Sequence, residues 1–388
     1  MKIKSSNRWK KLQLKEVVDY EQPNPYIVTT KIKEEGDLPV LTPGKSFIKG
    51  YTDETEGVFE NTPVIIFDDF TTDNKLVNFP FKVKSSAMKL LKTNTEKADL
   101  RFIFYQMQLI DVNTTTHKRY YISHYQNLEF LFPIDENGEI SLELQQQIVD
   151  EIEKQFTRLE ASVKDLKSVK DKLEVYRKSV LKSAFDLSID EKKITNYCKI
   201  ISGSTPKTSK KEFWNGEILW ITPKDLSGYH NKTINNTKRK ITQEGYDSCS
   251  TTLIPENNVL MSSRAPIGYL VINEKPMCTN QGFKSFKIIN HEILSEDFLY
   301  YQLKNIVEKI KRSGSGTTFN EISKTKAENI EIKVPDIKIQ KKIVQEIESH
   351  FSVIDKLQEV IESSLNKAEK LRKSILKSAF EGELVKNE

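Results

Sequence analysis

The chain has 388 residues, enough for two to three domains that each bury a core of their own. Hydrophobic residues make up 37% and charged residues 30% of the chain, and no run of 18 apolar residues occurs, which argues against a membrane-spanning helix. The three cysteines form no CxxC pair, so we expect a reducing compartment, no disulfide framework and no zinc site. The amino-terminal residues lack the apolar core of a secretory signal, and we expect a soluble, cytoplasmic protein.

The net charge of +5 is small but unevenly distributed along the chain. Lysine and arginine outnumber acidic residues by 21 to 14 in residues 193–335, whereas the counts are 19 to 18 in residues 1–135. The remaining residues are slightly acidic, at 20 to 23. A basic globular region beside acidic helices fits DNA binding, with the helices serving another partner. A solvated surface with excess lysine would give the same counts.

In chain order, the sequence predicts a globular region at 1–135, a long helix at 136–192, a second globular region at 193–335 and a second long helix at 336–388. Short β-branched and aromatic runs bounded by turn residues predict strands at Pro63–Phe67, Phe102–Tyr105, Gly216–Thr222 and Tyr269–Asn273. Short helices are expected at Ala87–Lys92 and Ser295–Arg312. Each globular region is therefore a mixed α/β unit, and the fold class is α+β.

The two predicted long helices are copies of one another. Tyr176–Phe185 reads YRKSVLKSAF and Leu371–Phe380 reads LRKSILKSAF, which is identical at eight of ten positions and 195 residues further along. The same offset holds upstream, where Ile152 and Phe156 reappear as Ile347 and Phe351. A fixed offset over a long stretch indicates a repeated structural unit.

Each copy carries apolar residues at steps of three and four, without Gly or Pro, as in a coiled coil. The expected seams are Ile152, Phe156, Leu159, Val163, Leu166, Leu173, Tyr176 and Val180 in the first helix, and Ile347, Phe351, Ile354, Ile361, Leu365, Ala368, Leu371 and Ile375 in the second. Two such seams in one chain bury each other if the helices pair, in parallel or antiparallel. The alternative is that each helix packs on its own globular region.

Catalytic signatures are missing from the sequence. Asn24-Pro25-Tyr26 lacks the second proline of an amino-methyltransferase loop, and Gly314-Ser315-Gly316 is followed by no Gly-Lys-Ser/Thr. Asp68 and Asp69 are expected to cap a turn rather than to bind a metal. No nucleophile, base and orienting group occur together, so we expect neither catalysis nor a cofactor in this chain.

Polar and basic loops are abundant instead, and they carry the residues that duplex recognition needs. Hydroxyl groups and lysines hold phosphates, arginine binds guanine edges and glutamine binds adenine edges. The candidate DNA contacts in the first globular region are Lys45, Thr71, Thr72, Lys75, Lys118 and Arg119. Those in the second are Lys207, Lys210, Lys211, Thr222, Lys224, Ser263, Arg264, Gln281, Lys284, Thr317 and Thr318. Trp214 and Trp220 are expected in the core rather than stacked on bases.

The combination of motifs resembles the specificity subunits of type I restriction-modification systems. The resemblance covers essentially the whole chain. It rests on Ser202-Gly-Ser-Thr-Pro206, Phe213-Trp-Asn-Gly216, Trp220-Ile-Thr-Pro-Lys-Asp-Leu226, Ser262-Ser-Arg-Ala-Pro-Ile-Gly268, Thr279-Asn-Gln-Gly-Phe283, Gly316-Thr-Thr-Phe319, Val64-Ile-Ile-Phe-Asp-Asp-Phe-Thr-Thr72 and the two RKSxLKSAF helix ends. Met261 departs from an expected leucine, and Asp186 stands where the second copy has the more typical Glu381-Gly382.

The resemblance implies a chain without catalysis of its own, in which two target-recognition domains each read one half of a bipartite site in double-stranded DNA. It implies that the long helices form an antiparallel coiled coil that sets the spacer and docks two methyltransferase subunits. Those subunits bring S-adenosylmethionine for adenine methylation, and motor-nuclease subunits bring ATP and magnesium. The alternatives are a methyltransferase-only system, an enzyme in its own right, and a coiled-coil scaffold that binds proteins.

Overall fold

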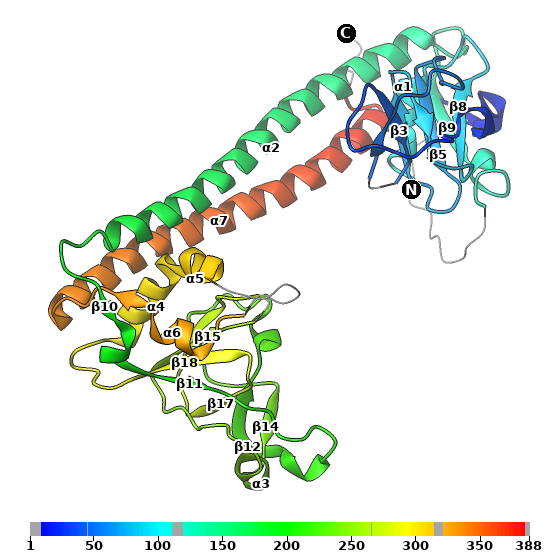
Figure 1. Cartoon of the computed structure of the whole chain (residues 1–388). Coiled ribbons are helices and arrows are strands. Elements are labelled where there is room, and N and C mark those ends of the chain that lie inside the picture. Colours follow the sequence, from blue (N-terminus) through cyan, green and yellow to red (C-terminus); the bar gives the residue numbers. More distant parts are fainter. Residues whose placement is uncertain (1–8, 45, 111–118, 265, 314–320, 385–388) are drawn as a thin grey trace. The chain divides into compact units, whose positions relative to one another are not determined.

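The computed structural model describes residues 9–44, 46–110, 119–264, 266–313 and 321–384. The chain divides into two compact units (Figure 1). Unit 1 contains residues 1–167 and 362–388, and unit 2 contains residues 168–361. Each unit therefore combines one globular region with part of both long helices. The boundaries of the four-part division stay a prediction.

The described residues of the globular region of unit 1 form three small sheets, one α-helix and short 3-10 helices at Leu14–Glu16, Asn24–Tyr26 and Tyr125–Asn127. Figure 1 shows this region at one end of the long helices of its unit. Its strands are β1 (Trp9–Gln13), β2 (Val18–Glu21), β3 (Leu38–Leu41), β4 (Ile48–Thr52), β5 (Val64–Asp68), β6 (Asn74–Val77), β7 (Lys82–Val83), β8 (Met88–Thr93) and β9 (Glu129–Pro133). The sheets have the strand orders β1–β9, β2–β8–β5–β6 and β4–β3–β7. The α-helix is α1 (Leu100–Met107). The four-stranded sheet is wholly antiparallel, and it places the loop after β5 beside the start of β8.

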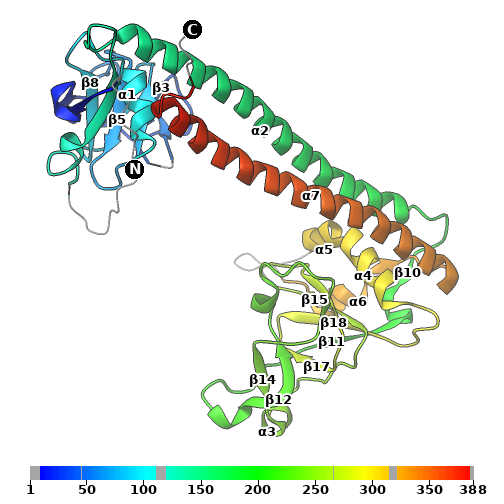
Figure 2. The ribbon, with the colours of Figure 1, turned by 180° about the vertical axis from the view of Figure 1, so that it is seen from behind.

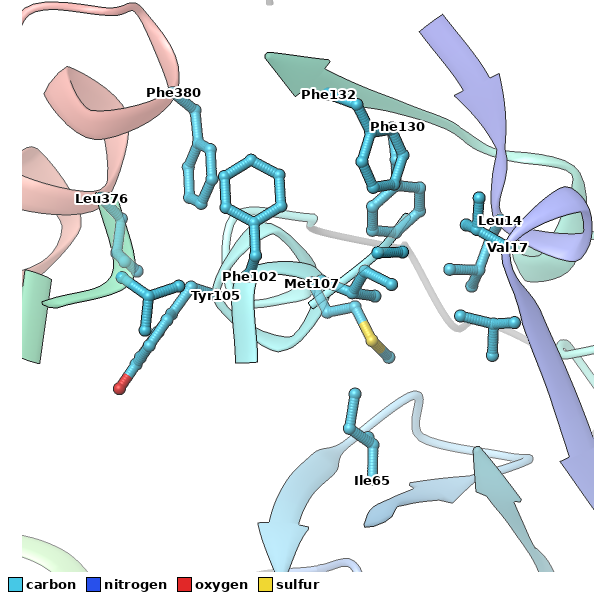
Figure 3. Packing of buried hydrophobic residues seen from close by; sticks show 14 of the residues in the cluster. Leu14, Val17, Ile65, Phe102, Tyr105, Met107, Phe130, Phe132, Leu376 and Phe380 are labelled. Carbon is cyan, nitrogen blue, oxygen red and sulfur yellow. The ribbon is translucent and has the colours of Figure 1, made fainter. Parts of the chain in front are cut away.

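Both long helices contribute to the main core of unit 1. Phe102 and Tyr105 of α1 pack in one cluster with Phe156 from α2 (Leu142–Ala184) and with Leu376 and Phe380 from α7 (Ile337–Phe380). Figure 3 shows Phe102 between Phe380 and the strand residues of this cluster. Apolar burial therefore fixes the beginning of α2 and the end of α7 on the first globular region.

The globular region of unit 2 repeats this plan with a larger sheet. Its strands are β10 (Lys192–Lys193), β11 (Cys198–Ser202), β12 (Trp214–Ile221), β13 (Thr233–Ile234), β14 (Arg239–Ile241), β15 (Asn258–Ser262), β16 (Leu270–Asn273), β17 (Met277–Thr279), β18 (Phe283–Ile288) and β19 (Glu331–Ile332). The sheets have the orders β11–β18–β15–β16–β13, β14–β12–β17 and β10–β19. Its described residues also form the α-helices α3 (Gln243–Asp247), α4 (Glu296–Asn305), α5 (Val307–Ser313) and α6 (Lys324–Glu328), with short 3-10 helices at Ile194–Asn196, Lys211–Phe213 and Pro223–Leu226. The strands predicted at 216–222 and 269–273 correspond to β12 and β16.

The long helices α2 and α7 lie side by side and run antiparallel, as Figure 1 and the reverse view in Figure 2 show. In unit 2, Gln358 donates a hydrogen bond to Glu174, and Arg177 pairs with Asp355, so numbers rise on α2 as they fall on α7. This confirms the expected pair of helices and decides between the parallel and antiparallel alternatives. No helix among the described ranges is long and apolar enough to cross a membrane.

In each unit an arginine, a phenylalanine and an acidic residue make the same contacts between α2 and α7. In unit 1 the Arg372 guanidinium lies 3.9 Å from the ring centre of Phe156 and bonds Glu160 at 2.9 Å. In unit 2 the Arg177 guanidinium lies 4.4 Å from the ring centre of Phe351 and pairs with Asp355. We call these trios the arginine clasps. All three members of one clasp lie 195 residues from their counterparts in the other.

The junction between helix and globule is repeated as well. The Gln145 side chain of α2 accepts a hydrogen bond from the backbone of Asp99, the amino-terminal cap of α1, at 3.0 Å. The Gln340 side chain of α7 accepts one from Ser295, the cap of α4, also at 3.0 Å. Both glutamines are fully buried. The two units therefore share one frame at the level of single hydrogen bonds.

Two predicted short elements were wrong. Residues 102–105 were expected in a strand but form α1, because Asp99 caps the helix by accepting from Arg101 and Phe102. Residues 87–92 were expected in a helix, but residues 88–92 lie in β8, which pairs with β5 on one side and β2 on the other. Sheet pairing on both edges outweighs the helical preference of Leu90 and Leu91.

One seam residue was wrongly predicted. Leu371 is 50% exposed although it fits the apolar spacing. Tyr176 is 46% exposed but does face the partner helix, because its ring centre lies 6.0 Å from that of His350 in α7. The next residue of each helix, Arg177 or Arg372, covers the facing phenylalanine instead. An arginine covers apolar surface with its stem and stacks on a ring with its guanidinium. Because the apolar pattern counts arginine as polar, it assigns the preceding residue to the seam in place of the arginine.

Candidate nucleic-acid interface

In unit 1 the loop between β5 and β6 carries predicted DNA contacts and is held by Asp68. The Asp68 carboxylate accepts hydrogen bonds from the backbone of Phe70 at 2.8 Å and Thr71 at 3.0 Å. This confirms that Asp68 caps a turn. Thr72 has a φ of 62°, which is strained for a β-branched residue, and such strain gathers at functional loops. Thr71 in this loop and Lys75 in β6 are exposed.

Asp69 joins this loop to a second one. Its backbone carbonyl accepts from Tyr120 at 2.8 Å, and its carboxylate accepts from the backbone of Tyr121 at 3.0 Å. Arg119, a predicted DNA contact, is exposed and directly precedes these residues. Asp69 itself is 2% exposed. Arg119 and the loop at 70–74 are therefore brought to the same part of the globule.

Lys89 of β8 is the buried partner of Asp69. Its ammonium nitrogen lies 3.6 Å from the Asp69 carboxylate and donates to the Gln22 side chain at 3.0 Å. It also lies 5.3 Å from the ring centre of Tyr20. Lys89 was not predicted from the sequence, because the spacing of β8 gives no sign that a lysine would face inward.

In unit 2 the polar loops converge at the ends of β12, β15 and β17. Gly203 is required there, since a side chain at this position would lie 2.1 Å from the Thr279 carbonyl oxygen. Ser204 donates its backbone hydrogen to that same carbonyl, and the Thr205 hydroxyl pairs with Gln281. The loop after β11 and the loop after β17 thus lie against one another.

Four of the predicted lysines of unit 2 are exposed on the loops after β11 and β12. Lys207, Lys210, Lys211 and Lys224 are exposed, and so is Gln281. Lys210 lies 3.8 Å from Glu212, a contact between exposed groups that leaves its charge largely available to a ligand. Exposed lysines grouped on adjoining loops provide the positive surface that a phosphate backbone requires.

Three predicted contacts of unit 2 are buried. Thr222 is 5% exposed and bonds Asp225, and Ser263 has no exposed surface. Lys284 is 4% exposed and donates to the Ser263 hydroxyl at 3.3 Å. Burial lowers the pKa of Lys284 below its ordinary value, Glu321 opposes that shift, and Arg264 adds to it. A direct DNA contact by these three side chains stays a prediction, and their burial argues against it.

Arg264 is the exposed cation beside this group. Its side chain is 49% exposed, and its Nε bonds Glu321 at 3.0 Å. An arginine held at one edge keeps further donors of its guanidinium for a base or a phosphate. Four other predicted contacts, Lys45, Lys118, Thr317 and Thr318, lie outside the described residues.

Trp220 lies in the core as expected, whereas Trp214 is only partly buried at the edge of the same cluster. Trp220 is 1% exposed, and its indole donates to the Ser204 carbonyl at 3.0 Å. Trp214 packs edge-on against it, with ring centres 5.0 Å apart. Sequence reasoning missed Arg239, whose guanidinium lies 4.6 Å from the Trp220 ring centre. This cluster therefore contacts the loop at Ser204 through the Trp220 hydrogen bond.

Comparison with known proteins identifies the family to which this chain belongs. The family described as "Type I restriction modification DNA specificity domain" matches residues 188–367. The EcoR124I/EcoR124II specificity subunit of Escherichia coli is 34% identical over 363 residues, which covers 90% of this chain and 88% of that protein. The chain belongs to the type I restriction specificity subunits. It is the DNA specificity subunit of a type I restriction-modification system.

Further relatives agree with this family. The MjaIX specificity subunit of Methanocaldococcus jannaschii is 36% identical over 189 residues, which covers 48% of this chain and 42% of that protein. A solved chain from work on assembly and conformational transition of the type I R-M system has a TM-score of 0.75 at 18% identity, covering 99% of this chain and all of that one. The HsdS subunit from Thermoanaerobacter tengcongensis gives 0.55 at 18% identity, with 97% of each chain covered. The structural matches confirm the fold class.

Within this specificity subunit, the described residues contain no group of three or more His, Cys, Asp or Glu side chains that could hold a metal. The carboxylates in the loop region have other partners. Asp68 caps a turn, Asp69 faces Lys89, and Glu321 pairs with Arg264. The specificity subunit's loop regions therefore offer hydrogen-bond donors and positive charge, which suit nucleic acid.

Proposed function

We propose that each globular region of this specificity subunit reads one half of a bipartite site in double-stranded DNA, while α2 and α7 fix the distance between the halves. The repeated frame supports this proposal. The arginine clasps and the Gln145 and Gln340 junctions recur at the 195-residue offset, whereas the loops between them differ. A frame that is repeated, with loops that differ between the two copies, is suited to two domains that read different DNA sequences.

In this proposal the exposed lysines bind phosphates and the exposed Arg264 and Gln281 bind base edges. Phosphate contacts set the position of the protein and carry no sequence information, while base contacts discriminate. The first globule uses Thr71, Lys75 and Arg119 in the corresponding way. The domain boundaries at 135, 192 and 335 separate these readers from the spacer helices.

We further propose that the subunit is not catalytic and acts in the cytoplasm with partner subunits. Two methyltransferase subunits would dock on the paired helices and bring S-adenosylmethionine, and motor-nuclease subunits would bring ATP and magnesium. No residue set for methyl or phosphoryl transfer was found in this chain's sequence, which agrees with chemistry supplied by partners. A system that only methylates would use the same specificity subunit without the nuclease.

The test is to express this subunit with its methyltransferase subunits and to map methylated adenines in the host DNA by long-read sequencing. The proposal predicts one motif with two defined halves and a spacer of constant length. A single continuous motif, or methylation without sequence preference, would refute it. Restriction of unmodified DNA by the complete complex then separates a nuclease system from one that only methylates.

A further inference from the structure

In each globule a buried lysine occupies the same place in the main sheet. Lys89 on β8 faces Phe67 of β5, and Lys284 on β18 faces Met261 of β15. The two lysines are 195 residues apart, the offset of the long helices. They are 1% and 4% exposed. A buried ammonium group is costly unless it is paired, so its presence at both positions calls for a specific role.

The residue that follows the facing strand is held in the same way in both globules. The backbone hydrogen of Asp69 is donated to the Ala87 carbonyl at 3.2 Å, just before β8. The backbone hydrogen of Ser263 is donated to the Gly282 carbonyl at 2.7 Å, just before β18. The loop after the strand is thus joined to the segment that leads to the buried lysine.

A third segment meets each of these residues. The Asp69 carbonyl accepts the backbone hydrogen of Tyr120 at 2.8 Å, and the Ser263 carbonyl accepts that of Ile322 at 2.9 Å. We call Asp69 and Ser263, with these backbone bonds, the loop junctions. Each loop junction therefore connects three stretches of chain that are distant in sequence.

The buried lysine completes each loop junction from the inside. The Lys89 nitrogen lies 3.6 Å from the Asp69 carboxylate. The Lys284 nitrogen donates to the Ser263 hydroxyl at 3.3 Å and lies 3.8 Å from Glu321, the residue before Ile322. The acid differs between the globules, but in both cases the ammonium group is bound to the junction residue.

The stretches that meet at the loop junctions carry the predicted DNA contacts. In unit 1 they are the loop with Thr71 and the residue Arg119; in unit 2 they include Arg264 and Gln281. An ammonium group that fixes these stretches from the core side determines where the exposed side chains stand. A displacement of about 1 Å is enough to lose a base-specific hydrogen bond, because such bonds require close and aligned atoms.

We propose that Lys89 and Lys284 are positioning residues, each of which holds the DNA-facing loops of its own globule and thereby sets base discrimination in one half-site without touching DNA. This inference rests on the proposed function, since it needs each globule to read a half-site. It assigns Lys284 a different role from the direct contact predicted from the sequence.

The test uses Lys284→Met and Lys89→Met in the full-length chain assembled with its methyltransferase subunits. Lys287→Met and Lys92→Met are matched controls, because they make the same change three residues further along β18 and β8. The wild-type site is first defined by selection from random duplexes. Binding is then measured to duplexes with single base-pair changes in either half, over a range of salt concentrations.

Lys284→Met is expected to reduce discrimination about tenfold in the half-site of its own globule, within the range that one base pair supplies. Discrimination in the other half-site stays at the wild-type level. The slope of log binding constant against log salt also stays unchanged, whereas removal of a group that neutralises one phosphate would lower it by about 0.9. Amide exchange at Ile322 becomes faster and at Tyr120 does not. Lys89→Met is expected to reduce discrimination in the half-site of the first globule only, and to make amide exchange faster at Tyr120 but not at Ile322.

Unchanged discrimination, equal reductions in both half-sites, or a slope lowered by about 0.9 would each overturn the inference. Absence of specific binding by the wild-type assembly would instead refute the proposed function, which keeps the two failures apart. If Lys284→Met does not fold, Ser263→Ala decides the matter. It removes only the hydroxyl that accepts from Lys284 and is expected to give a smaller reduction in the same half-site.

Discussion

The arginine clasps allow a quantitative test of the repeated frame. Replacing Arg372 or Arg177 by alanine removes a guanidinium stacked on a buried ring and an ion pair across the helices. Phe156 and Phe351 are 4% and 6% exposed, so each loses part of its cover. A cation over an aromatic ring contributes about 0.5–1 kcal/mol when exposed and about 2 kcal/mol when desolvated. An exposed ion pair adds about 0.2–1 kcal/mol.

The two clasps differ in exposure, and the expected effects differ accordingly. The Arg372 side chain is 45% exposed, so Arg372→Ala is expected to lower the free energy of unfolding by about 1–1.5 kcal/mol. The Arg177 side chain is 19% exposed, so Arg177→Ala is expected to cost about 2–3 kcal/mol. Leu371→Ala is the control, because Leu371 precedes Arg372 and is half exposed. It is expected to cost under about 0.5 kcal/mol.

Urea unfolding of the full chain, followed by circular dichroism, measures these differences as shifts in midpoint at constant slope. A double-mutant cycle with Glu160→Ala then separates the ion pair from the stacking, because the cycle isolates the pairwise energy. If Arg372→Ala costs no more than Leu371→Ala, the clasp does not stabilise the helix pair and the reasoning fails.

Three further predictions concern pH and DNA. The pKa of Glu54 is held well below its ordinary value, chiefly by the hydrogen bond from Lys82. The ionised pair therefore stabilises the fold at pH values above the unfolded pKa of about 4.3, and this stabilisation is lost as the pH falls towards the lower pKa of the folded state. Glu54→Gln should therefore destabilise the chain by about 3 kcal/mol at pH 7 and progressively less below pH 4, which urea titrations at several pH values would detect. Replacing Lys210 and Lys211 by glutamine should weaken binding to all duplexes alike and lower the salt slope by about 0.9 for each phosphate that is no longer neutralised; an unchanged slope would contradict this. Arg264→Ala should instead relax base preference at one position by about 1–3 kcal/mol in selections from random duplexes, and a uniform weakening would show that it binds phosphate.

The large features of the fold could be predicted because they depend on local periodicity. The 195-residue repeat and the apolar steps of three and four identify α2 and α7, and short β-branched runs identify β5, β12 and β16. The relative direction of the long helices within the pair could not be derived, since a seam of apolar residues fits parallel and antiparallel neighbours equally. Contacts such as Arg177 with Asp355 supply that information only in three dimensions.

The candidate site was only partly predictable for a different reason. Polar residues in loops look alike in sequence whether they face solvent or the core. Lys210 is exposed, whereas Lys284 is buried, and nothing in either local sequence distinguishes them. Lys284 is buried because β18 pairs with β11 and β15 at its edges and is covered on both faces, so that five of its six residues are buried. That placement depends on pairing between distant segments, which composition and spacing do not record.

The central claim is that a rigid helix pair sets the distance between two half-sites. The most direct measurement is the spacer preferred by a chain with seven residues inserted at facing positions, between Lys167 and Ser168 in α2 and between Ser364 and Leu365 in α7. One heptad keeps the apolar seam in phase and adds about 10.5 Å, which corresponds to about three base pairs of DNA. Binding is measured to duplexes that carry both half-sites with spacers of increasing length. The account predicts that the original spacer is no longer preferred, with a preference for a longer one or no specific binding; an unchanged spacer preference would contradict it.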